Sequence, residues 1–125
     1  MRSYTVATVA LTLGVTAKWI DNALSRFRVA GVVQKGQGIS RRLTPQSVVS
    51  LHIAIELCNS LGLPLAAALQ TAQQITAEGS FSRIGLFPFA FLTVDVDATT
   101  RELSERLAQA VEIAPVPKRG RPRLK

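Results

Sequence analysis

The sequence predicts a mainly helical fold with a small β part: a winged helix-turn-helix, two further helices, then a strand and a C-terminal helix. Three observations support this prediction. Two short apolar series with helical spacing flank Gly14. A basic, glycine-rich segment bounded by β-branched residues follows them. A long apolar segment then begins at Thr44-Pro45, a combination typical of a helix start.

Length and charge set the next limits. At 125 residues, 47% hydrophobic and 18% charged, the chain should form one folded domain with a modest core. Residues 1–44 carry seven basic residues and one acidic residue, a net charge of +6. Residues 45–117 carry three and seven, a net −4, and residues 118–125 carry five and none, a net +5. Basic ends around an acidic middle suit a protein that presents both ends to a polyanion.

The first two helices are predicted on either side of a tight turn. Their apolar positions are Val6, Val9, Ala10 and Leu13, then Ile20, Ala23, Leu24 and Phe27. Ala10 allows the helices to approach, Gly14 tolerates positive φ, and Thr16 is expected to cap a second helix that begins at Ala17. Its outward side chains suit phosphates and base edges. The candidate contacts there are Thr16, Lys18, Asn22, Ser25 and Arg26.

A helical hairpin of another kind has the same spacing, so the next segment matters. Residues 32–34 and 39–43 are predicted strands around the tip Lys35-Gly36-Gln37-Gly38. Such a wing can follow a sugar-phosphate backbone, with basic side chains and glycine amides as donors. The candidate contacts are Lys35, Gly36, Gly38, Arg41 and Arg42. The alternative is a solvated hairpin whose arginines keep an edge soluble.

The rest of the body is predicted from helix signals. Thr44 as N-cap and Pro45 begin a third helix that ends at Gly62, and a fourth runs from Leu63-Pro64 to about Ala77. Leu86 to Val96 is predicted to contain a half-buried strand with no nearby partner, which could pair with the wing or with a second copy. Thr99 and Glu102 form a capping box for a last helix, ending near Ile113.

The order of these motifs resembles the winged-helix DNA-binding domain of the MerR superfamily. The residues that carry the resemblance are Tyr4-Thr5-Val6, Ala10, Leu13-Gly14-Val15-Thr16, Gly31-Val32-Val33, Arg41-Arg42-Leu43-Thr44 and Leu61-Gly62-Leu63-Pro64-Leu65. The resemblance implies a helix in the major groove, a wing on the backbone and a two-fold dimer. Lys18 fits the family's first basic position, whereas Asp21 and Asn22 stand where arginine and tyrosine are usual. The long coiled coil and sensory cysteines are missing, so metal sensing is not implied.

The last residues resemble an AT-hook, whose core is Arg-Gly-Arg-Pro with basic flanks. Two arginines separated by glycine can lie along a narrow A·T-rich minor groove, and proline keeps the chain extended. The candidate contacts are Lys118, Arg119, Gly120, Arg121, Pro122 and Arg123. A nonspecific basic tail is the alternative. The predicted organisation is therefore 1–78 for the winged domain, 79–114 for an extension that could dimerise, and 115–125 for the tail.

Several functions are disfavoured. Cys58 has no second cysteine to pair with, and His52 is the single histidine, so no four-ligand zinc set exists. We expect packed groups there, with no enzymatic activity, catalytic residue, metal or cofactor. A secretory signal before Val15 is disfavoured because threonines and a tyrosine interrupt the apolar run. The run from Ile84 to Val96 is too short to span a bilayer.

The sequence thus predicts a cytoplasmic, nucleoid-associated protein that binds double-stranded DNA with an A·T-rich flank. Transcriptional regulation as a homodimer, without a membrane partner, is the preferred role. One alternative is an accessory factor that bends DNA in recombination, excision or segregation. Another is a protein-interaction adaptor whose basic ends meet an acidic partner.

Overall fold

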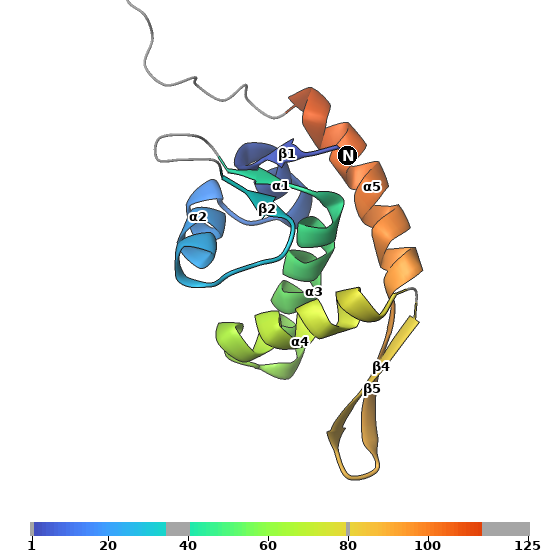
Figure 1. Cartoon of the computed structure of the whole chain (residues 1–125). Coiled ribbons are helices and arrows are strands. Elements are labelled where there is room, and N and C mark those ends of the chain that lie inside the picture. Colours follow the sequence, from blue (N-terminus) through green and yellow to red (C-terminus); the bar gives the residue numbers. More distant parts are fainter. Residues whose placement is uncertain (1, 35–40, 80, 114–125) are drawn as a thin grey trace, which may run out of the picture.

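The computed structural model describes residues 2–34, 41–79 and 81–113 (Figure 1). Within these ranges the chain is mainly helical with a small antiparallel β part, as predicted. The elements in order are β1 (Tyr4–Thr5), α1 (Val6–Leu13), α2 (Ala17–Arg26), β2 (Val32–Val33), β3 (Arg42–Leu43), α3 (Pro45–Leu61), α4 (Leu65–Glu78), β4 (Phe81–Phe87), β5 (Ala90–Asp95) and α5 (Val96–Ile113).

Helices α1 and α2 are joined by the short turn that the sequence predicts. Helix α1 ends at Gly14, whose φ of 73° is a left-handed value that glycine adopts without a Cβ clash. Ala10 is buried beside the turn. The Trp19 amide donates to Thr16 Oγ1 at 3.0 Å, which confirms Thr16 as the cap and Ala17 as the first residue of α2.

The loop after α2 is fastened to α4. Helix α2 ends at Arg26, and the chain crosses to β2. The Ala30 amide donates to Gln73 Oε1 at 3.0 Å, and Gln73 Nε2 donates to the Arg28 carbonyl at 3.1 Å. Through these two bonds Gln73 of α4 fixes the path of this loop over the body.

A three-stranded antiparallel sheet of order β1-β3-β2 stands beside the first two helices. Leu43 in β3 is paired with Tyr4 on one side and Val32 on the other, and its side chain is fully buried. The predicted strand pair is confirmed at β2 and β3, while residues 39–40 lie outside the described part. Strand β1 was not predicted, because two residues are too few to show alternation.

The start of α3 differs in one detail from the prediction. Helix α3 begins at Pro45 and is terminated by Gly62, its C-cap, as expected, but Thr44 makes no side-chain cap. Its hydroxyl donates to the Gly31 carbonyl at 2.9 Å, which ties the loop before β2 to the start of α3. Helix α4 packs against α3, and Ala68 and Ala72 are fully buried in that contact.

The C-terminal part contains a hairpin that the sequence prediction missed. Strand β5 pairs antiparallel with β4, from the immediately preceding residues, so the expectation of a strand without a nearby partner was wrong. Residues 84–87 of β4 are apolar side chains and a glycine, so this strand lacks the alternation that marks a half-buried strand. Pro88 and Phe89, with φ 66°, lie between the two strands.

The predicted capping box is also wrong. Helix α5 begins at Val96, before Thr99. The Ala98 amide donates to Asp95 Oδ1 at 3.0 Å, and the Thr99 hydroxyl donates back to the Asp95 carbonyl at 2.9 Å. Asp95 therefore caps the N-terminus of α5 in place of Thr99, because its carboxylate lies closer to the first free amides of the helix.

Helix α5 packs on the body and the hairpin projects from it (Figure 1). Leu103 and Leu107 are buried in the same core cluster as Val9 of α1 and Leu51 of α3. Helix α5 contacts both α1 and α3 along that side. None of the helices in the described ranges combines the length and apolar character needed to cross a membrane.

Candidate nucleic-acid interface

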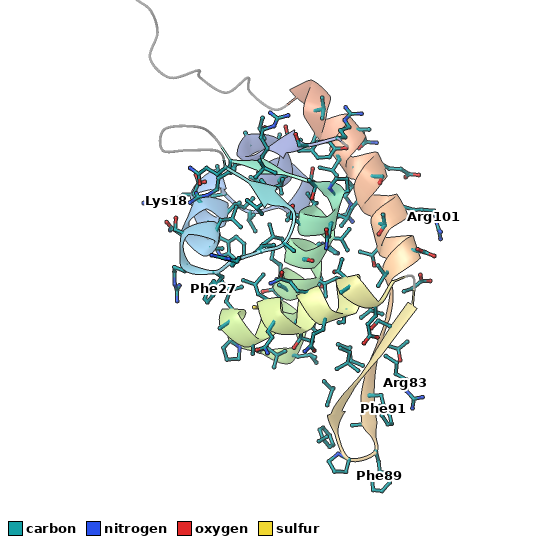
Figure 2. The ribbon with its side chains drawn as sticks, in the orientation of Figure 1. Lys18, Phe27, Arg83, Phe89, Phe91 and Arg101 are labelled. Atoms are coloured by element: carbon teal, nitrogen blue, oxygen red, sulfur yellow. The ribbon has the colours of Figure 1, made fainter. Side chains whose placement is uncertain are left out.

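One side of α2 is polar and open to solvent. Ile20 and Ala23 are buried on the inner side, so the helix is fixed in rotation by the core. The outward side chains are all exposed, and Figure 2 shows Lys18 at the outer edge of α2. These exposed residues are Thr16, Lys18, Asp21, Asn22, Ser25 and Arg26. The candidate contacts of this helix therefore lie on one accessible surface.

Asp21, the single acidic residue of residues 1–44, is paired within the protein. Arg41 Nη1 lies 3.1 Å from Asp21 Oδ1, and Arg41 Nη2 donates to Ser25 Oγ at 3.2 Å. The Ser25 hydroxyl in turn donates to the Asp21 carbonyl at 2.8 Å. Arg41 thus links the segment before β3 to α2 and offsets the carboxylate on that helix.

The other residues of the predicted wing divide into two groups. Arg42 turns toward the N-terminus, where its Nε donates to Ser3 Oγ at 3.1 Å and its Nη2 to the Ser3 carbonyl at 3.0 Å. It is exposed, so these bonds orient the guanidinium without removing it from solvent. Lys35, Gly36 and Gly38 lie outside the described residues, as do all six predicted contacts of the tail, residues 118–123.

A basic hollow lies between the end of α2, the following loop and β2. Its volume is about 790 Å³, and Arg26, Arg28 and Arg41 line it together with residues 29–31. The Arg26 guanidinium stacks over the Phe27 ring at 5.0 Å, which holds it near the helix end. Arg28 was missed by the sequence prediction, because it follows the helix and belongs to no motif. Three arginines around one open hollow make a place suited to an anion.

His52 and Cys58 lie away from this surface. His52 is half-buried in a hollow of about 350 Å³ between α3 and α5. Burial lowers its pKa below the ordinary value of 6.5, Arg106 also lowers it, and Glu56 and Glu102 raise it. Cys58 is half-buried and packed against the core. The two residues lie six positions apart on α3, about 1.7 turns or 9 Å along the helix axis, so they do not form a site together.

Comparison with known proteins adds no assignment. Neither the protein-family models nor the curated proteins give a match to this chain.

Proposed function

We propose that this chain binds double-stranded DNA sequence-specifically and acts as a transcriptional regulator. In this proposal α1 and α2 form a helix-turn-helix with α2 in the major groove. The β2–β3 hairpin is the wing that follows the backbone, and residues 118–123 enter an adjacent A·T-rich minor groove. The protein has no enzymatic role and is cytoplasmic, associated with the nucleoid.

The observation that carries the proposal is the Asp21–Arg41 pair. A carboxylate on a helix that approaches DNA is repelled by phosphate, and Asp21 is the acidic residue of α2. The pair compensates the carboxylate within the protein, at 3.1 Å. Lys18, Asn22 and Arg26 then stand on the exposed side of α2 beside a carboxylate that is paired within the protein. A helix with such a surface suits a polyanion.

The basic hollow supports the same proposal. It lies next to the end of α2, and its arginines come from α2, the following loop and the segment before β3. A backbone phosphate at this position would be bound by guanidinium groups while α2 lies in the groove. Gln73 would act indirectly, because it fixes the loop that carries Arg28.

The two alternatives differ from this proposal in what they require. A recombination, excision or segregation factor would use the same surface and would add strong DNA bending. An adaptor would use the basic charge for an acidic protein and would show no preference among duplexes. Selection of duplexes from a random pool, followed by a bending assay on the selected site, separates the three.

The selection also tests individual residues. Lys18→Ala or Asn22→Ala should change the selected bases, because a good side-chain contact to a base edge discriminates by about 1–3 kcal/mol. The matched control is Arg101→Ala, a basic residue on the outer side of α5 (Figure 2). Enrichment of no sequence by the wild-type protein would overturn sequence-specific binding.

A further inference from the structure

The β4–β5 hairpin, called the arm below, ends in exposed aromatic side chains. Phe89 is 98% exposed at its tip, Phe87 69% and Phe91 54% (Figure 2). Together they expose on the order of 400 Å² of apolar surface, since a phenylalanine can bury about 200 Å². A patch of that size on a protein surface marks a contact site more often than chance exposure.

The arm is not suited to DNA by charge. Residues 84–94 carry no charged side chain, and the nearby Arg83 stacks over the Phe91 ring at 3.9 Å. A segment that follows a phosphate backbone needs free basic groups. Figure 1 also shows the arm pointing away from α2, with α3 and α4 between them. The partner of the arm is therefore apolar, and it approaches from the side away from the proposed DNA surface.

The same chain carries an apolar hollow at the base of the arm. It has a volume of about 260 Å³ and is lined mainly by side chains of α3 and β5. The apolar lining residues are Ile53, Leu57, Leu61, Leu92 and Val94. Leu61 is 50% exposed at this hollow, so the hollow offers apolar contact that the monomer leaves open to solvent.

We propose that the arm docks on a second copy of this chain, with Phe89 of each copy in the other copy's hollow. Strand β4 has seven residues, so the arm is about 23 Å long at ~3.3 Å per residue. Two arms that lie antiparallel about a two-fold axis place each tip beside the other's base, where the hollow lies. The contact is self-complementary, which is the form that a two-fold interface requires.

The area agrees with a specific dimer. The exposed phenylalanines of both copies and the surfaces that they cover together reach on the order of 1,600 Å², the size of a standard interface. The interface leaves α2 of both copies uncovered. A second copy is preferred to a lipid surface because it supplies a shaped apolar hollow, whereas Arg83 is the single basic residue in residues 81–94 for lipid head groups.

Sedimentation equilibrium of the full chain without DNA tests the proposal, so its outcome does not depend on DNA binding. The wild-type protein should dimerise at micromolar concentration. Phe89→Ser removes the inserted side chain, and Leu61→Glu places a charge in the hollow. Each should weaken the dimer at least about 100-fold. The contact occurs twice in a two-fold dimer, and a loss of about tenfold at each contact multiplies to that factor. Leu11→Ser, at an equally exposed leucine of α1, is the control and should leave the dimer unchanged.

Mixing the two variants gives the sharper result. A heterodimer of Phe89→Ser and Leu61→Glu chains keeps one intact pair of phenylalanine and hollow, so it should form more tightly than either variant's homodimer. Circular dichroism checks that each variant is folded. A wild-type protein that remains monomeric would overturn the proposal. In that case, co-sedimentation of the protein with phosphatidylcholine vesicles would indicate that the arm binds lipid instead. If the Leu61→Glu variant dimerises as tightly as the wild-type protein, the assignment of the hollow is wrong.

Discussion

Arg41 is bonded at once to the Asp21 carboxylate and to the Ser25 hydroxyl, at 3.1 and 3.2 Å. The two acceptors lie one turn apart on α2, and the arginine comes from the segment before β3. The carboxylate on α2 is therefore compensated by a residue of another element. This relationship links the proposed recognition helix to the proposed wing.

The first prediction concerns this pair. Asp21→Asn should leave the unfolding free energy within about 1 kcal/mol, because the Asp21 side chain is 52% exposed and solvent screens the pair on that side. It should steepen the salt dependence of DNA binding by about one phosphate, a change in slope of ~0.9, because Arg41 is released. Fluorescence anisotropy at several salt concentrations measures the slope. Arg41→Ala should weaken binding to all duplexes, and an equal effect of Arg101→Ala would remove the special role of Arg41.

A second prediction concerns Gly31, which has φ +92°. A Cβ there would lie 2.4 Å from Thr44 Oγ1 and 3.3 Å from the Ser47 amide nitrogen. Gly31→Ala should destabilise the protein by about 2–4 kcal/mol, through backbone strain and loss of the Thr44 hydrogen bond. Gly14→Ala is the control, since it has φ +73° with nothing within 4 Å and should cost only about 1–2 kcal/mol. Urea unfolding compares them; equal losses would contradict the steric argument.

The third prediction is a pH dependence of stability from His52. Its pKa is lowered in the folded chain by burial, so below pH 6.5 the unfolded chain binds more protons than the folded one. The contribution of neutral His52 to the free energy of unfolding is fully present above pH 6.5. It should be lost as the pH drops from there toward the lowered pKa. His52→Gln should flatten that part of the profile. Thermal unfolding between pH 7.5 and 5 is the measurement, and an unchanged slope in the variant would contradict it.

The fourth prediction concerns the basic tail. Deletion of residues 118–125 should weaken binding to A·T-rich duplexes more than to G·C-rich ones and should flatten the salt slope, because five basic residues are lost. The double substitution Arg119→Lys with Arg121→Lys keeps the charge. It should retain most of the slope and lose the A·T preference, because arginine is favoured in a narrow minor groove. If the deletion leaves the affinity for both kinds of duplex unchanged, the tail has no role in DNA binding.

Local signals predicted much of the fold, and tertiary contacts account for what they missed. Gly14, Thr16 and Pro45 act through neighbours in sequence, so the bounds they imply could be predicted. The failures at Thr44 and Thr99 have another cause. Thr44 donates to Gly31 across a loop, and Asp95 lies closer to the free amides than Thr99 does. Strand β4 was missed because its residues 84–87 show no polar alternation.

The candidate interface could be predicted in part, for the same reason. Helical spacing put Lys18, Asn22 and Arg26 on one side of α2, where they lie exposed. The pairing of Arg41 with Asp21 joins residues twenty positions apart, and the link from Gln73 to Arg28 joins residues forty-five apart. No periodicity in one sequence reports such contacts. The hollow with its three arginines follows from those links.

The salt dependence of binding to duplex DNA tests the central claim most directly. Affinity should fall linearly on a log-log plot, with a slope of about −0.9 for each phosphate contacted. Asp21→Asn should make that slope steeper, and tail deletion should make it shallower. A slope near zero, with an affinity for DNA no better than for an unrelated polyanion, would contradict the proposed function.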